Sequence, residues 1–383
     1  MSLRLDYEIG ERFSFEISRA SAQARFSRSD ISMSFQADNT AFEDWLRTQC
    51  QVVKSDLDYK HERMRRNSFV FLRATYFRWA KRIESLCPEC ARAPKALSVG
   101  DTHTENFGTW RDAEGRLVWG VNDFDEAAVI PYPFDLIRLA TSVRLAPKRD
   151  CSNRDAADAI LLGYLEGLSR PRPILLDEQE TWMREYVACS DDQRRKFWAE
   201  VEKYPDAEPP VHVEQGLRNA LPVDAVVWRF ASRVKGGGSL GRPRFVAIAK
   251  WRGGKIVREA KALVPSAWNW AHGDSDEGLQ FLKLASGNFR APDPFLNLES
   301  RFIIRRVAAD SRKINLGDEA GADLKTDLLR VMGFDLGAIH AATPAAADKI
   351  SDDLASRDPS WLARAAKIAA MAVEQDFEEW RRN

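Results

Sequence analysis

Two short acidic segments decide which fold this chain can adopt: Gly100-Asp101-Thr102-His103-Thr104-Glu105-Asn106-Phe107 and Val121-Asn122-Asp123-Phe124-Asp125-Glu126. The residues between them predict a hairpin, with strands at 107–110 and 117–121 joined by a polar, glycine-containing turn. A further short strand is predicted at 97–99. This layout brings the two acidic segments to one end of a small sheet.

Asp101, Asn106 and Asp123 form a candidate site at that end of the sheet. Two carboxylates and an amide oxygen suit a magnesium-bound phosphate, with one carboxylate left to act as a base. Aspartate and asparagine are also common in solvated turns. The prediction of a functional site therefore depends on the two segments together and on a second phosphate-type signal later in the chain.

The composition limits the classes of protein. At 383 residues the chain is long enough for two to three domain-sized units. Lysine plus arginine equals aspartate plus glutamate, at 57 each, which gives no support for a nucleic-acid partner. We find no apolar run of about 18 residues and no signal peptide, and therefore expect no membrane partner and a cytoplasmic location.

The cysteines point to the same compartment. Five cysteines without framework spacing are typical of a reducing environment. The single pair Cys87 and Cys90 has no second pair nearby to complete a zinc site, and no redox-type helix follows it. We expect two reduced thiols in a loop.

The chain divides into blocks of different character. Residues 41–86 are predicted to be helical, and residues 133–220 mainly helical. Three strands follow at 226–234, 244–251 and 255–261, and the helical pattern returns from residue 324. We predict three units: helices and the acidic hairpin at 1–220, a β-rich part at 221–307, and C-terminal helices at 308–383.

The second informative feature is a glycine-rich loop between the first two of those strands, Lys235-Gly236-Gly237-Gly238-Ser239-Leu240-Gly241. The dinucleotide fingerprint and the P-loop require a strand, a loop and then a helix, which is absent here. A glycine loop between two strands is the lid that covers ATP phosphates in protein kinases. The predicted nucleotide-binding residues of this loop are Gly236, Gly237, Gly238, Ser239 and Gly241.

A lysine on the third strand completes this unit. Lys261 lies about twenty residues past the loop, where a kinase-like small lobe places the lysine that holds the phosphates. Lys250 on the middle strand and Arg258 in another register are the alternatives. Lys255 lies in a turn and is predicted to be solvated.

The acidic segments also resemble a known active site. The run 100–106 is similar to the catalytic loop of aminoglycoside phosphotransferases and choline kinases, where a G-D-x-H-x-x-N pattern carries the base and a metal ligand. Residues 121–125 resemble the metal-binding strand end of those families, and 134–140 resemble their next helix. The glycine loop and lysine precede the catalytic loop in those families but follow it here, so the chain resembles a circularly permuted relative.

The same runs resemble the domain of unknown function 2252 family, over most of the chain from about residue 65. They lie at 100–108, 122–126, 135–142 and 236–241. Two positions depart from the family pattern. Ala262 follows the lysine where an acidic residue is usual, and Arg305-Arg306 replaces an Arg-Gln pair.

The resemblance implies an α+β, protein-kinase-like fold of two lobes, circularly permuted, with a small antiparallel-sheet lobe and a larger, mostly helical lobe. It implies an ATP- and Mg²⁺-dependent phosphotransferase acting on an unidentified small molecule or protein. Asp101 would be the base, with Asn106, Asp123 and Asp125 as magnesium ligands. His103 would support the loop by binding its backbone or Asp135, and Asp135 would cap its helix and brace the loop.

Two other classes of protein remain open. A nucleotide-binding regulator would keep ATP without transferring phosphate. A metal-dependent phosphoester hydrolase would use Asp101, His103, Asp123 and Asp125 as metal ligands, but would leave the glycine loop and Lys261 unexplained. Transfer of an adenylyl group instead of a phosphoryl group is a variant of the phosphotransferase prediction. The sequence does not specify the acceptor.

Overall fold

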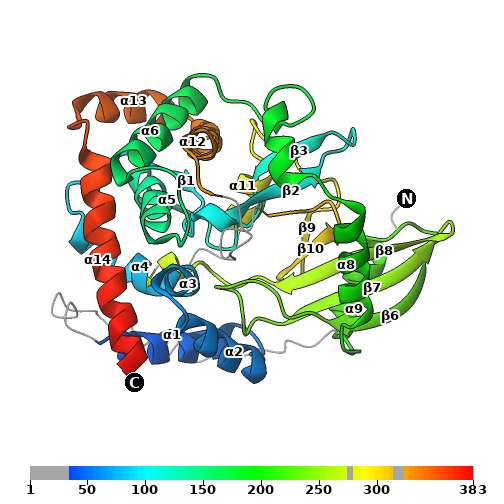
Figure 1. The fold of residues 1–383 in the computed structure, drawn as a ribbon. Helices are drawn as coiled ribbons and strands as arrows, with labels where there is room; N and C mark the ends of the chain where they lie inside the picture. Colours follow the sequence, from blue (N-terminus) through cyan, green and yellow to red (C-terminus); the bar gives the residue numbers. More distant parts are fainter. Residues whose placement is uncertain (1–33, 274–278, 314–322, 383) are drawn as a thin grey trace, which may run out of the picture. The chain divides into compact units, whose positions relative to one another are not determined.

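The described chain begins with four helices, α1 to α4, before the first strand (Figure 1). This computed structural model describes residues 34–273, 279–313 and 323–382, within a unit that spans residues 34–383. The predicted division at residues 220 and 307 stays a prediction. The helices are α1 (Phe35–Gln49), α2 (Lys54–Met64), α3 (Ser68–Ala74), α4 (Tyr76–Leu86), α5 (Pro133–Leu145), α6 (Asn153–Ser169), α7 (Arg184–Val187), α8 (Asp191–Glu202), α9 (Val211–Asn219), α10 (Ala267–His272), α11 (Leu279–Ala285), α12 (Thr326–Ala341), α13 (Ala346–Ser356) and α14 (Trp361–Arg382), with 3-10 turns at Thr104–Asn106 and Thr181–Met183.

The strands are short and antiparallel. They are β1 (Lys95–Ser98), β2 (Phe107–Arg111), β3 (Leu117–Val121), β4 (Ala128–Pro131), β5 (Ile174–Leu175), β6 (Val226–Ser232), β7 (Arg244–Trp251), β8 (Gly254–Ala262), β9 (Asn297–Glu299) and β10 (Phe302–Val307). The predicted mixture of helices with small antiparallel sheets is therefore confirmed.

The block predicted to be helical at 41–86 is divided among four helices, α1 to α4. Asn67 begins α3, because its side chain accepts a hydrogen bond from the backbone of Val70. This block also supplies part of the core, because Phe69, Phe71, Leu72, Tyr76 and Trp79 are all buried.

The predicted hairpin is confirmed. Strands β2 and β3 pair from Phe107 opposite Val121 to Arg111 opposite Leu117, so the two acidic segments lie at the same end. The strand predicted at 97–99 does not join this hairpin. It corresponds to β1, which pairs instead with β4 from the segment after the second acidic run.

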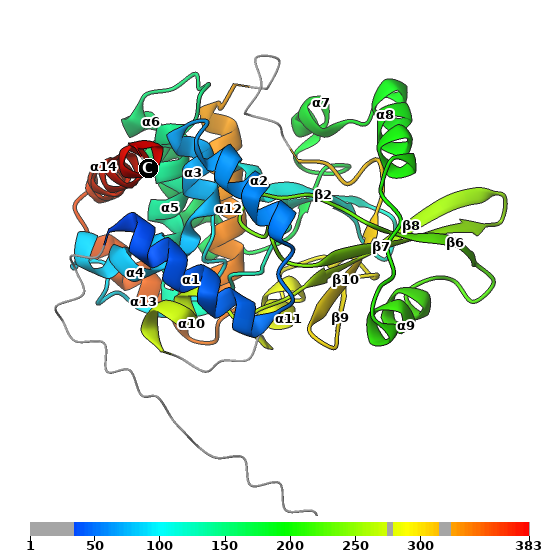
Figure 2. The ribbon, with the colours of Figure 1, turned by 90° about the horizontal axis from the view of Figure 1, so that it is seen from below.

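The three strands predicted after residue 225 are confirmed, but they belong to a five-stranded sheet with the order β6-β7-β8-β10-β9. Helix α9 packs on one face, against residues such as Ala260 and Ile304. Helix α8 packs on the outer part of the other face, against Val257 and Val307 (Figure 2). The same second face carries charged residues farther along β8, and these face the site described below.

No helix in the described part of the chain is long and apolar enough to cross a bilayer.

Cys87 and Cys90 are free, as expected, and both are fully buried. Burial raises the pKa of Cys87 to about 12 and that of Cys90 to about 11. Because the thiolate is the reacting form, we expect iodoacetamide at pH 8 to label neither thiol in the native protein. Mass spectrometry should find the partly exposed Cys189 labelled first, and the buried pair labelled only after unfolding. Rapid native labelling of the pair would contradict this arrangement.

Candidate active site

The loop after β1 is held by a buried carboxylate from another helix. Asp135, in the first turn of α5, accepts hydrogen bonds from the backbone N–H groups of Val99 (2.7 Å) and Gly100 (2.8 Å). Its Oδ2 also lies 3.2 Å from Nε2 of His340 at the end of α12. Gly100 has a φ of 81°, and a Cβ there would lie 2.3 Å from the carbonyl oxygen of Glu126. Helices α5 and α12 therefore fix the start of the loop.

The predicted role of Asp135 needs one correction, and for His103 the structure selects one of the two predicted alternatives. Asp135 braces the loop, but its side chain does not cap α5, because its oxygens are taken by the loop backbone. His103 binds the loop backbone rather than Asp135: its Nδ1 accepts a hydrogen bond from the N–H of Glu105 (3.2 Å). Burial, together with the nearby Arg73 and Lys313, lowers the pKa of His103 well below its usual value. The ring is therefore neutral, with its proton on Nε2.

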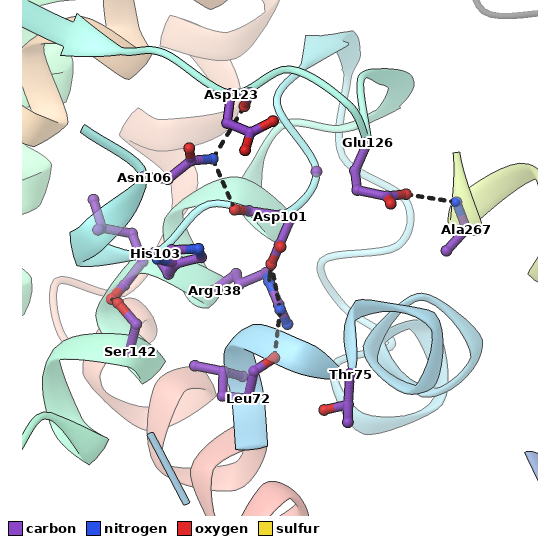
Figure 3. Close-up of polar contacts among 12 residues, drawn as sticks. Leu72, Thr75, Asp101, His103, Asn106, Asp123, Glu126, Arg138, Ser142 and Ala267 are labelled. Carbon is purple, nitrogen blue, oxygen red and sulfur yellow. Dashed lines mark hydrogen bonds and ion pairs between the residues drawn. The ribbon is translucent and has the colours of Figure 1, made fainter. Parts of the chain in front are cut away.

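Asn106 links the two acidic segments (Figure 3). Its side-chain N–H₂ donates to the backbone carbonyl oxygens of Asp101 and Asp123, at 3.1 Å each. Its Oδ1 is buried and has no hydrogen-bond partner among the described residues. A buried amide oxygen without a donor is costly unless a ligand satisfies it, so this atom is a candidate cation ligand.

Asp101 is oriented by an arginine from α5. The fully buried Arg138 donates to Asp101 Oδ1 from Nε (2.8 Å) and from Nη2 (2.5 Å), and Nη2 also donates to the carbonyl oxygen of Leu72 (2.9 Å; Figure 3). Burial raises the pKa of Asp101, and Arg138 opposes that shift. The other oxygen, Oδ2, faces the glycine loop, since a Cβ at Gly238 would lie 3.6 Å from it.

Lys261 reaches the second acidic segment from the five-stranded sheet. Its Nζ lies 3.1 Å from Asp123 Oδ1 and 2.7 Å from Asp125 Oδ1. Burial alone would raise the pKa of Asp123, but Lys261 and Lys313 hold it well below its usual range. Burial and the charge of Asp123 raise the pKa of Asp125. Asp123 is therefore a stable anion at the cavity wall.

Arg242, the residue directly after Gly241, connects the glycine loop to the same acidic segment. It is buried and pairs with Asp125 (3.2 Å) and Glu126 (2.8 Å). Glu126 in turn accepts a hydrogen bond from the backbone N–H of Ala267 at the start of α10 (2.6 Å; Figure 3). Asp125 is thus shared between Lys261 and Arg242, which leaves it less available to a metal than Asp123.

The glycine loop lies over the acidic residues. Gly236, Gly237, Gly238 and Ser239 line the same cavity as Asp101 and Asp123. Gly241 does not line the cavity; its backbone packs on α2, where a Cβ would lie 2.7 Å from Leu57.

The alternative phosphate-binding residues lie elsewhere. Strand alternation places Arg258 on the opposite face of β8 from Lys261, where its Nε donates to the carbonyl oxygen of Ala220 (2.8 Å). Lys250 is exposed on β7, with its Nζ 5.9 Å from the centre of the Trp228 ring. Of these three cations, the structure brings only Lys261 to the acidic residues.

A second cationic group lies beside Lys261 on the same face of the sheet. The fully buried Glu259 pairs with Arg233 (2.6 Å), Arg244 (2.9 Å) and Arg305 (2.8 Å). Three arginines around one carboxylate leave two positive charges facing the cavity. Arg306, the neighbour singled out in the sequence, also lines the cavity and donates to the carbonyl oxygen of Arg111 (3.1 Å).

The cavity between these groups has a volume of about 740 Å³. Eleven basic and seven acidic side chains line it, although the whole chain has no net charge. The size suits a nucleotide-sized ligand, and the excess of positive charge favours an anionic one.

The donor set fits a magnesium ion held mainly by its ligand. In the part of the chain that the structure describes, no three His, Cys, Asp or Glu side chains are grouped to hold a metal ion. Magnesium usually takes one or two protein carboxylates and completes its shell with water and phosphate oxygens. Asn106 Oδ1 and Asp123 are the protein ligands that such an ion would find here.

Several site residues had no role assigned from the sequence. Arg138 lies in the run 135–142 that resembles the family, and Arg242 lies next to the glycine loop. The positions of both arginines in the sequence could therefore have indicated a role in the site. Glu126 closes the second acidic segment. Lys313 lies in an irregular segment after β10, where no sequence pattern points to a site.

With this geometry established, comparison with known proteins gives one match. Residues 52–170 match the family described as "Uncharacterized protein conserved in bacteria (DUF2252)". This confirms the predicted resemblance for the segment that holds the catalytic-type loop, the hairpin and Asp135. The match does not include the glycine loop or Lys261. No curated protein and no solved structure matches the chain.

Proposed function

We propose that this chain is an ATP- and Mg²⁺-dependent phosphotransferase with a circularly permuted, protein-kinase-like fold. The observation that carries the proposal is the contact of Lys261 with Asp123, across 138 residues of sequence, beneath a glycine loop that lines the same cavity. A loop of free backbone amides, a buried lysine and an acidic pair are the parts that phosphoryl transfer requires around a nucleotide.

Each residue has a distinct task in this proposal. The backbone of Gly236–Ser239 covers the phosphates, and Lys261 moves from Asp123 toward their oxygens. Asn106 and Asp123 would hold magnesium, which would supply positive charge to the transferred group. Asp101, held by Arg138, orients the acceptor hydroxyl and accepts its proton.

The hydrolase alternative is less well supported. It requires Asp101, His103, Asp123 and Asp125 as metal ligands, but Asp101 pairs with Arg138 and Asp125 with Lys261. His103 uses Nδ1 to accept a backbone hydrogen bond. A regulator that binds nucleotide without transferring phosphate would have the same site geometry. Measurements of ATP turnover distinguish such a regulator from a phosphotransferase.

Nucleotide binding is the first test. We expect ATP with Mg²⁺ to raise the melting temperature, since a ligand at a hundred times its Kd stabilises the native state by about 2.7 kcal/mol. Lys261→Met should remove most of this shift because the phosphates lose their buried cation. Lys250→Met, which changes an exposed lysine on the neighbouring strand, should keep it. The absence of any shift with purine nucleotides at millimolar concentration would refute the proposal.

A further inference from the structure

The rim of the cavity near Asp101 carries positive charge that the nucleotide does not require. Four basic side chains lie there, from α2, α3, their connection and the segment after β10: Arg63, Arg66, Arg73 and Lys313. Glu105 is the acidic residue paired with one of them, Arg73. This rim is thus a second positively charged region, besides the arginines around Glu259 on the sheet.

The guanidinium group of Arg73 is held in place by its contacts but does not use all of its hydrogen-bond donors. One end pairs with Glu105, and its planar group lies 5.3 Å from the centre of the Phe69 ring. Its Nε is buried and has no hydrogen-bond partner in the described chain. The backbone of Arg73 also touches the glycine loop, since a Cβ at Gly238 would lie 3.1 Å from its carbonyl oxygen. The free donor is therefore held close to the loop tip and to Asp101.

Lys313 reaches the site from the segment after β10. Its backbone is tied to the hairpin by a bridge to Gly108, and its side chain lines the cavity. Within the described residues, its ammonium group has no ion pair within 4.0 Å. Lys313 is an exposed residue, but partial desolvation at the cavity, together with Arg305 and Arg73, lowers its pKa to about 8 despite the attraction of Asp123. Such mutual repulsion of cations is relieved when an anion binds between them.

His103 adds a neutral donor between these two cations. Its Nδ1 is used, so its protonated Nε2 is the remaining polar atom of the ring, and the residue lines the cavity. The surroundings of the proposed base therefore offer a guanidinium, an ammonium and an imidazole N–H. This is the donor set of an oxyanion site.

The nucleotide already has enough cations without this rim. A triphosphate with its magnesium ion carries about two negative charges. Lys261 and the surplus of the Glu259 cluster lie on the sheet side and balance them. Arg73 instead acts on Asp101, and both Arg73 and Lys313 act on His103, two residues from the proposed base. Lys313 also lies near Asp123.

We propose that the acceptor carries an oxyanion group, of the phosphate or carboxylate type, which Arg73 and Lys313 bind beside Asp101. This inference rests on the proposed function, because only a phosphotransferase has an acceptor. The anion site itself can be tested without measuring turnover. The site would select against cationic acceptors, because Arg73, Lys313 and the neighbouring rim arginines would repel them.

The experiment measures anion binding when the nucleotide site is filled. Melting temperature is recorded with saturating non-hydrolysable ATP analogue and Mg²⁺, in sodium phosphate, sodium acetate or choline chloride, each matched in ionic strength with sodium chloride. We expect phosphate to raise the melting temperature further and choline to have no effect. Acetate shows whether a carboxylate also suffices. Arg73→Met and Lys313→Met should each weaken phosphate binding at least tenfold, whereas Lys313→Arg and Lys250→Met should retain it.

Three results would overturn the inference. Phosphate binding that is unchanged in Arg73→Met and Lys313→Met would place the anion elsewhere. Loss of the phosphate effect when the analogue saturates would assign these cations to the nucleotide. Stabilisation by choline instead of phosphate would reverse the predicted charge of the acceptor.

The proposed function and the anion site can fail separately. If the ATP analogue does not bind, the proposed function fails. A Lys313-dependent shift of the melting temperature by phosphate, without nucleotide, would still support the anion site.

Discussion

Replacing Asp101 by asparagine should reduce Mg²⁺-dependent ATP turnover by about 10²- to 10⁴-fold, the usual contribution of a positioned base. The amide keeps the size of the side chain but loses the charge and the proton acceptor. Nucleotide binding should persist, because Asp101 is held by Arg138 and its free oxygen faces the loop tip rather than Lys261. Release of ADP measures turnover, and the nucleotide-induced shift in melting temperature measures binding.

The control must account for the buried arginine. Asp101→Asn leaves Arg138 with a weaker partner, and an uncompensated buried charge costs about 3 kcal/mol or more. Asp353→Asn weakens another arginine–carboxylate pair, with Arg357, far from the cavity in the fold. It should lower stability without changing turnover per folded molecule. Complete loss of nucleotide binding in Asp101→Asn would show that the roles of Asp101 and Asp123 have been exchanged.

Asp123→Ala provides the complementary result and separates the three classes of protein. Loss of a metal ligand and of the partner of Lys261 should weaken both metal-supported nucleotide binding and turnover. A nucleotide-binding regulator would show no turnover in any variant and would respond only to Asp123→Ala. A metal hydrolase would cleave phosphoesters without nucleotide and would be indifferent to Lys261→Met.

Gly163→Ala should destabilise the protein by about 3 kcal/mol or more. Helices α6 and α12 pack through two pairs of glycines spaced four residues apart, namely Gly163, Gly167, Gly333 and Gly337. A Cβ at Gly163 would lie 1.8 Å from the carbonyl oxygen of Arg330, which is backbone and has no alternative rotamer. The helices must separate to admit the methyl group, and overpacking of this kind costs one to several kcal/mol.

The consequence should extend to the active site. Helix α12 carries Asp335, whose Oδ2 accepts a hydrogen bond from the backbone N–H of Val121 (2.7 Å), and His340, which contacts Asp135. Displacement of α12 therefore loosens both acidic segments, and the nucleotide-induced melting shift should fall as well. Denaturant unfolding measures the stability. Gly287→Ala is the matched control, because its Cβ would find ordinary contacts of 3.5–3.6 Å. A change below about 1 kcal/mol in Gly163→Ala would contradict this packing.

The local elements and the chemistry of the acidic residues could be predicted from the amino-acid sequence. Strand alternation and turn residues predicted β2, β3, β6, β7 and β8, because hairpins are encoded by neighbouring residues. The choice of Asp101, Asn106, Asp123 and Lys261 as site residues needed only residue types and their order. The structure brings all four together, with Asn106 tied to both aspartates and Lys261 paired with Asp123.

The pairing of cations with carboxylates in the cavity could not be predicted, because it depends on long-range packing. Arg138 comes from a helix, Arg242 from a loop end and Lys313 from an irregular segment. Their positions depend on contacts across 37 residues for Arg138 with Asp101, 117 for Arg242 with Asp125 and 205 for Lys313 with Gly108. The addition of β9 and β10 to the sheet and the glycine crossing of α6 and α12 are likewise long-range. Periodicity and turn chemistry describe interactions between near neighbours, whereas the charge balance of the cavity arises where distant segments pack.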